Sequence, residues 1–218
     1  MKRKSVLIIG IGRFGRHMAK KLSELGNEVM IVDQSESRVS DLLPFVASAQ
    51  IGDCTNLDVL KSLGITNFDI CFVCIGSNFQ SAIEITYQLK ELGAHYVISK
   101  ANRELHEKFL LRNGADEVVY PEKESAIKTA IRTSAHLVFD YIELTPDYSI
   151  VEIPTLESWV GRTINQVGIR NSYKITILAT KKGEHISPLP GAKHIFKAEE
   201  HLIIAGEKND LEKLFKKF

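Results

Sequence analysis

The first half of the chain alternates short apolar runs with segments in which apolar residues recur every three or four positions. Phe14, Met18, Leu22 and Leu25 form one such stripe, which predicts a helix whose apolar side packs on a sheet. Asp69–Ile75 is apolar at nearly every position, as in a central parallel strand buried on both faces. The other predicted strands are Ser5–Gly10, Glu28–Asp33, Ala47–Ile51, Tyr96–Lys100 and Glu117–Tyr120.

This alternation predicts an α/β fold, with a Rossmann-like, doubly wound parallel sheet in the strand order 3-2-1-4-5-6. We assign this domain to residues 1–122 and a linking helix to residues 123–140, where Lys123–Phe139 reads as one helical stretch. Residues 141–218 have short strands and frequent turns, and are expected to form a small α+β subdomain. Its expected elements are the strands Ile150–Ile153, Thr176–Thr180 and Leu202–Ile204, a hairpin turn at Lys181–Glu184, a loop at Pro188–Gly191 and a helix over Asp210–Phe218.

The first apolar run leads into a glycine fingerprint, G-x-G-x-x-G, at residues 10–15. Gly10 permits a tight turn, Gly12 lets a phosphate approach the backbone, and Gly15 lets the helix pack close to the strand. The helix N-terminus offers unpaired N–H groups and the positive end of the helix dipole to an anion. Asp33 ends the second strand, where an acidic residue meets ribose hydroxyls. The alternative is a glycine-rich turn that binds no nucleotide.

Ligands of doubly wound sheets bind at the carboxyl ends of the strands. Asp53 and Cys54 would flank the base there. Lys100 closes a buried strand with a charge that calls for an anion or for solvent, and Arg13 can neutralise a phosphate. Both cations can instead be solvated surface groups. The residues assigned to a nucleotide are Gly10, Gly12, Arg13, Phe14, Gly15, Asp33, Gln34, Asp53, Cys54, Ile75, Gly76, Ser77 and Lys100.

Charge and composition exclude several classes of protein. The 28 basic and 27 acidic side chains give a net charge of +1, which does not favour nucleic-acid binding. No apolar run approaches the roughly 18 residues that span a bilayer, so a soluble, intracellular protein is expected. The 3 cysteines fit a reducing compartment rather than a disulfide framework.

Motifs for catalysis are absent from the sequence, so the chain is not expected to be an enzyme. It contains neither H-E-x-x-H nor G-x-S-x-G. Cys71 and Cys74 lie three apart in a strand and point to opposite faces, so they cannot jointly hold zinc. One alternative is a small NAD-dependent oxidoreductase, which would need a catalytic residue in the second half. Another is a Rex-like transcription regulator, which would need a winged helix with a basic recognition helix.

Several of these motifs, in this order, resemble the regulator-of-potassium-conductance (RCK/KTN) family. The likeness is greatest to the KtrA/TrkA-like cytosolic subunits of bacterial potassium-uptake systems. Glutathione-gated efflux regulators share the first domain, but usually as a tail fused to membrane helices. The motifs are Ile9–Gly15, Asp33, Gly52-Asp53, Ile75-Gly76, Ser99–Ala101, Gly114–Asp116 and Tyr120–Glu122, with Val160–Thr163, Thr176–Ala179, Ile186–Pro190 and Leu202–Gly206 in the second half.

The resemblance implies a cytoplasmic homo-oligomer, from a dimer to an octameric ring, at the inner face of the membrane beneath a KtrB/TrkH-like potassium transporter. Bound ATP or ADP, or NAD or NADH, would switch that transporter. Asp33 disfavours the 2′-phosphate of NADP. By the same resemblance, Arg13 and Lys100 would contact phosphates, Asp33 the ribose, and Glu122 a Mg or Ca ion at the dimer contact. For Glu122 alone, a helix-initiating role is equally consistent with its position.

The second half also resembles a subdomain that binds cyclic di-AMP. Two positions depart from the family pattern, which often has asparagine where Thr176 stands and an apolar residue where Asn165 stands. The residues that would form this second ligand site are Ile164, Asn165, Arg170, Thr176 and Pro190.

Overall fold

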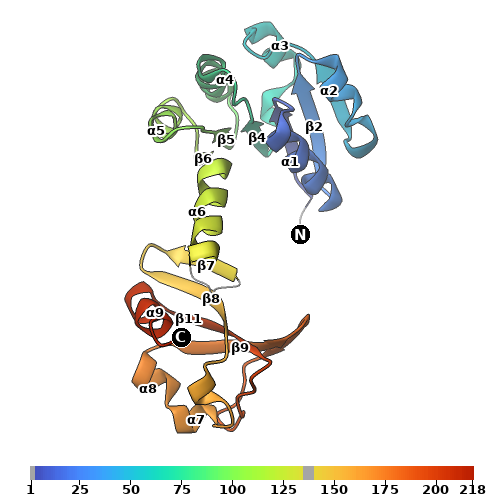
Figure 1. Ribbon diagram of the computed structural model, residues 1–218. Coiled ribbons are helices and arrows are strands. Elements are labelled where there is room, and N and C mark those ends of the chain that lie inside the picture. The colour runs from blue at the N-terminus through green and yellow to red at the C-terminus, as the bar shows by residue number, and fades with distance from the viewer. Residues whose placement is uncertain (1–2, 135–139) are drawn as a thin grey trace. The chain divides into compact units, whose positions relative to one another are not determined.

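The computed structural model describes residues 3–134 and 140–218 (Figure 1). It divides the chain into two compact units, Met1–Lys123 and Glu124–Phe218.

A six-stranded, all-parallel sheet forms the centre of the first unit. Its strand order, β3-β2-β1-β4-β5-β6, confirms the predicted order. The direction of winding reverses between β1 and β4, because β1 pairs with β2 on one side and with β4 on the other. Chains that leave these two strands diverge, and a crevice opens at that point. The strands are β1 (Ser5–Ile9), β2 (Glu28–Asp33), β3 (Ser48–Ile51), β4 (Ile70–Val73), β5 (Val97–Lys100) and β6 (Glu117–Val119).

Helices pack on both faces of this sheet and bury two separate cores. Successive residues of β1 point to opposite faces. Leu7 and Ile9 therefore join one core, whereas Val6 and Ile8 join the other. This explains why the run is apolar at every position rather than at alternate ones. The helices are α1 (Arg13–Glu24), α2 (Glu36–Ser40), α3 (Leu57–Ser62), α4 (Phe79–Glu91) and α5 (Glu104–Arg112), with 3-10 turns at Leu43–Phe45 and Ile65–Asn67.

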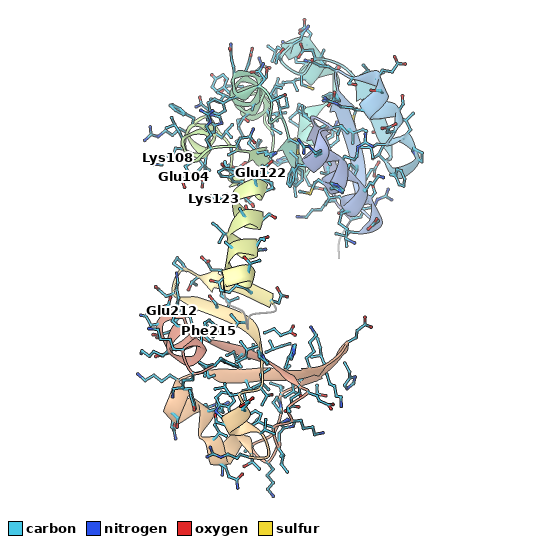
Figure 2. All side chains as sticks on the ribbon, in the orientation of Figure 1. Glu104, Lys108, Glu122, Lys123, Glu212 and Phe215 are labelled. Atoms are coloured by element: carbon cyan, nitrogen blue, oxygen red, sulfur yellow. The ribbon has the colours of Figure 1, made fainter. Side chains whose placement is uncertain are left out.

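Helix α6 (Pro121–Ser134) follows β6 directly. Proline suits its first position because the first N–H of a helix has no intrahelical partner. Lys123 of α6 reaches Glu104 of α5, with 2.8 Å between ammonium and carboxylate (Figure 2). The predicted helix extended to residue 140. Residues 135–139 lie outside the described residues, and Asp140 begins strand β7 instead.

The second unit contains a five-stranded antiparallel sheet in the order β10-β9-β11-β8-β7. Trp159, Phe196 and Leu202 are at the centre of its core. The expected strands and the hairpin turn before His185 are confirmed, whereas β7, β10 and two short helices were not predicted. The elements are β7 (Asp140–Thr145), β8 (Tyr148–Pro154), a 3-10 turn (Glu157–Trp159), α7 (Ile164–Val167), α8 (Ile169–Tyr173), β9 (Thr176–Lys182), β10 (His185–Pro188), β11 (His201–Glu207) and α9 (Lys208–Phe215).

Candidate functional site

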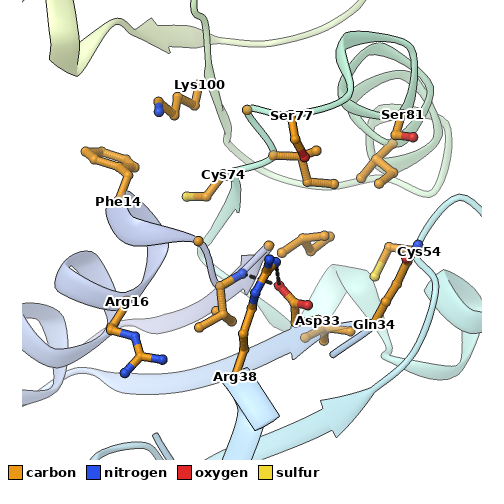
Figure 3. A pocket seen from close by; sticks show the side chains of 18 of the residues that line it. Phe14, Arg16, Asp33, Gln34, Arg38, Cys54, Cys74, Ser77, Ser81 and Lys100 are labelled. Atoms are coloured by element: carbon orange, nitrogen blue, oxygen red, sulfur yellow. Dashed lines mark hydrogen bonds and ion pairs between the residues drawn. The ribbon is translucent and has the colours of Figure 1, made fainter. Parts of the chain in front are cut away.

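A cavity of about 890 Å³ lies in the first unit, at the carboxyl ends of its strands (Figure 3). Its position agrees with the crevice expected where a doubly wound sheet reverses direction. Gly15 is the one residue assigned to the nucleotide that does not line it. The residues that the cavity brings together are Gly10, Gly12, Arg13, Phe14, Asp33, Gln34, Asp53, Cys54, Ile75, Gly76, Ser77 and Lys100, and Glu122 joins them.

The glycine loop is closely packed at Gly10 and Gly15 and open to the cavity at Gly12. Gly10 has φ +92°, a conformation that side chains disfavour, and its N–H donates to the Val32 carbonyl. A Cβ on Gly12 would meet no atom within 4 Å, so the cavity wall is open there. A Cβ on Gly15 would lie 2.2 Å from the Gly10 carbonyl oxygen, which is why only glycine fits at this contact. Among the residues that the structure describes, no side chain caps the first turn of α1, so its N–H groups are available to an anion.

Asp33 joins the end of β2 to the glycine loop. Its Oδ2 accepts a hydrogen bond from the Ile11 N–H at 2.6 Å, and its Oδ1 accepts one from the Ser35 N–H at 2.8 Å. The Arg38 guanidinium lies 3.5 Å from Oδ2, which partly balances the buried charge (Figure 3). Each carboxylate oxygen has two lone pairs, so Asp33 retains capacity to accept from ribose hydroxyls.

Asp53 and Cys54 lie on the loop after β3 and differ in charge. The side chain and N–H of Thr55 donate to Asp53, and together with a smaller contribution from Gln34 they lower its pKa. Burial raises the pKa of the Cys54 thiol to about 12, and the charges of Asp53 and Asp33 add to this shift. Cys54 is therefore a neutral, apolar wall and not a nucleophile.

Cys71 and Cys74 belong to the two different cores, which confirms that they point to opposite faces of the sheet. Burial raises the pKa of each thiol to about 12. Within residues 3–134 and 140–218, no three His, Cys, Asp or Glu side chains gather as a metal site.

Positive charge collects beside the start of α1. Lys100 Nζ lies 2.6 Å from Glu122 Oε1 and 5.9 Å from the centre of the Phe14 ring. The hydrogen bond from Lys100 lowers the pKa of Glu122, and Arg13 adds a smaller electrostatic contribution. Two cations thus face one carboxylate next to a helix N-terminus, which leaves an excess of positive charge for phosphate groups.

Sequence reasoning missed six polar residues that line the cavity, namely Arg16, His17, Arg38, Thr55, Ser81 and Asn102. Arg38 lies on α2, five residues after Asp33, and Asn102 follows Lys100 by two residues. The side chain of Asn102 donates from Nδ2 to the Gly76 carbonyl. The backbone carbonyl of Asn102 accepts from the Tyr120 hydroxyl at 2.5 Å. The sequence contains a signal for Arg38, because it is a basic residue about one helical turn beyond Asp33. Nothing in the local pattern predicts a role for Asn102.

The structure only partly brings together the residues predicted to form the second ligand site. The N–H groups of Ile164 and Asn165 donate to the carbonyls of His194 and Ala192, so the segment after Pro190 lies along α7. Arg170 is exposed on α8, and Thr176 begins β9. Over the described part of the chain, no hydrogen bond or ion pair joins these side chains to one another. The second ligand site stays a prediction.

None of the helices formed by the described residues is both long enough and apolar enough to cross a bilayer.

Comparison with known proteins places both units in known families. Residues 6–121 match the TrkA-N domain and residues 148–218 match the TrkA-C domain. The chain is 40% identical over 215 residues to Ktr system potassium uptake protein C of Bacillus subtilis, covering 99% of this chain and 97% of that protein. It is 36% identical over 213 residues to Ktr system potassium uptake protein A of the same organism, covering 98% and 96%. These relatives are potassium uptake proteins rather than enzymes, which agrees with the expectation that the chain is not an enzyme.

Solved structures share the fold. The GsuK channel bound to NAD is similar with a TM-score of 0.69 at 19% identity. The match covers 99% of this chain but 39% of the channel chain.

Proposed function

This chain belongs to the TrkA-N/TrkA-C family that includes the Ktr system potassium uptake proteins, and we propose that it is the nucleotide-binding regulatory subunit of a Ktr/Trk-type potassium-uptake system. Bound ATP or ADP, or NAD or NADH, would switch a KtrB/TrkH-like membrane transporter, which would hold the subunit at the inner face of the membrane. The observation that carries the proposal is the cavity, in which an uncapped helix start, two cations and a buried strand-end carboxylate face one space.

The cavity residues fit a nucleotide along its whole length. The N–H groups at the start of α1, with Arg13 and Lys100, would hold phosphates. Asp33 would accept from ribose hydroxyls, and Asp53 and Cys54 would border the base. The nucleotide supplies a phosphate group whose presence or absence changes contacts, and a ligand shifts a conformational equilibrium only through such differences.

The proposal is tested by isothermal titration of the purified full chain with ATP, ADP, NAD, NADH and cyclic di-AMP. We expect at least one adenine nucleotide to bind with micromolar or tighter affinity. If none of ATP, ADP, NAD and NADH binds, the nucleotide proposal is overturned. The transporter role is tested separately, by asking whether the chain restores potassium-limited growth to bacteria that retain a Ktr-type membrane subunit but lack its regulatory partner. Unrestored growth would count against that role.

Arg13→Ala is expected to reduce affinity for ATP more than affinity for ADP, by about tenfold in their ratio. Arg13 is exposed at the start of α1 and lines the cavity where a third phosphate would emerge. Titration calorimetry of both nucleotides measures the ratio. Arg112→Ala removes an exposed arginine that does not line the cavity and serves as the control. An equal loss for ATP and ADP would show that Arg13 does not read the terminal phosphate.

We expect the protein to be at least a dimer in solution. Large apolar side chains are exposed on two helices, among them Leu105 on α5 at 61% and Ile127 on α6 at 44%. Exposed apolar surface of this kind is typical of an interface between subunits. Light scattering at micromolar concentration with nucleotide present measures the mass, and a monomer there would contradict both the assembly and the transporter role.

A divalent cation at Glu122 remains a prediction. Mg and Ca ions prefer six or more oxygen ligands, and Lys100 already occupies one oxygen of Glu122. The described residues of one chain therefore do not form a cation site by themselves. Phosphate oxygens, or Glu122 of a second copy, would have to complete it.

A further inference from the structure

The side-chain amide of Asn102 is held in one orientation with its oxygen unused. Nδ2 donates to the Gly76 carbonyl, and turning the amide over would set two acceptor oxygens against each other. Oδ1 is buried, and among the described residues it has no hydrogen-bond partner. A buried acceptor without a donor is destabilising, so an unused one in a cavity wall points to a donor that arrives in another state.

Lys100 is a cation of the same cavity wall that can supply this donor. Asn102 Oδ1 and Lys100 Nζ both lie beside Gly76. A Cβ on Gly76 would be 3.3 Å from Asn102 Oδ1 and 3.5 Å from Lys100 Nζ. An ammonium group carries three donors, and the hydrogen bond to Glu122 uses one of them. The side chain of Lys100 is only 11% exposed, so the partners available to it are the groups around the cavity.

Glu122 is a partner that Lys100 can leave. Its side chain is 62% exposed in the first turn of α6, where water can replace the ammonium. Exposed ion pairs contribute little to stability, whereas a phosphate group offers an ammonium several charged oxygens. A phosphate at the start of α1 would therefore compete with Glu122 for Lys100.

We infer that Lys100 exchanges partners when a nucleotide phosphate enters the cavity, leaving Glu122 for the phosphate and for the Asn102 amide oxygen. This inference rests on the proposed nucleotide function and describes its regulation. Glu122 is in the helix that leads from the first unit into the second, so the exchange removes a tie between β5 and the start of α6. Occupancy of the cavity is thereby converted into a change at that helix, and the released carboxylate becomes available to another cation.

The exchange is tested by a double-mutant cycle on the full chain, titrated with ATP and with adenosine in EDTA. Glu122→Gln removes the competing carboxylate and is expected to tighten ATP binding about three- to tenfold without changing adenosine binding. In a Lys100→Met background the same substitution should have no effect, because no ammonium remains to exchange. Asn102→Ala should weaken ATP binding about two- to fivefold, again only when Lys100 is present.

Glu104→Gln is the matched control. It removes an exposed carboxylate on α5 that pairs with Lys123 of α6, the helix that also carries Glu122, and neither Glu104 nor Lys123 lines the cavity. If Glu122→Gln tightens ATP binding equally in the Lys100→Met background, long-range repulsion explains the effect and the exchange is overturned. An unchanged ATP affinity for Glu122→Gln overturns it as well, and this exposed substitution does not threaten folding. If the wild-type chain binds no nucleotide at all, the proposed function fails first, which is a distinguishable result.

Discussion

Asp33→Ala is expected to weaken binding of every adenine nucleotide by about 1.5–3 kcal/mol for each charge-assisted hydrogen bond lost, or roughly ten- to a hundredfold per bond. The carboxylate would accept from the ribose and also holds the Ile11 N–H, so the substitution removes a ligand contact and loosens the glycine loop. Burial of the Asp33 side chain adds a second expected effect, since two backbone N–H groups lose their acceptor. We therefore expect a lower thermal midpoint even without ligand.

Two further variants separate these effects. Asp33→Asn keeps the size and one acceptor oxygen, so it should lower the thermal midpoint less than Asp33→Ala does. Glu24→Ala removes an exposed carboxylate that pairs with Lys21 at 3.0 Å, and neither residue lines the cavity, so it should change neither property substantially. Calorimetry and thermal unfolding of the three variants give the comparison. Nucleotide affinity that survives Asp33→Ala would remove the ribose role.

Alanine substitutions at Gly15 and Gly12 are expected to impair different properties. Gly15→Ala should lower stability, and Gly12→Ala should lower nucleotide affinity. Gly15→Ala places a methyl group 2.2 Å from the Gly10 carbonyl oxygen, so strand and helix must separate. Overpacking of this kind costs about 1–3 kcal/mol or more, and the contact with a backbone atom favours the upper end. Gly12→Ala adds its methyl where no atom lies within 4 Å, at φ −72°, which alanine adopts freely.

Gly12→Ala should therefore change the free energy of unfolding by less than about 1 kcal/mol. The added methyl would stand where a phosphate approaches the backbone, so nucleotide affinity should fall by roughly tenfold or more. Chemical denaturation and nucleotide titration on both variants measure the two quantities. A Gly12→Ala protein that is stable and binds nucleotide normally would show that the loop does not cradle a phosphate.

The sequence predicted the first unit well because its signals are local. Strands β1, β2 and β4 contain unbroken apolar runs, and helix α1 shows a three- and four-residue apolar spacing, and neither signal needs knowledge of distant residues. The second unit was harder to predict. Strand β7 has exposed Ile142 and Leu144, so its apolar pattern does not reflect a buried face, and the short helices α7 and α8 span little more than one turn each.

By itself, then, the sequence determined the six-stranded sheet, the glycine turn and the acid at the end of β2, because turn conformation and hydrophobic periodicity act between residues close in the chain. Only the tertiary structure decided which side chains meet across the cavity. The pairs Lys100–Glu122 and Asn102–Gly76 join residues that are 22 and 26 positions apart. These contacts depend on strand order and register, which bring the ends of β4, β5 and β6 to one edge of the sheet. A one-dimensional pattern does not contain the separations between side chains on neighbouring strands.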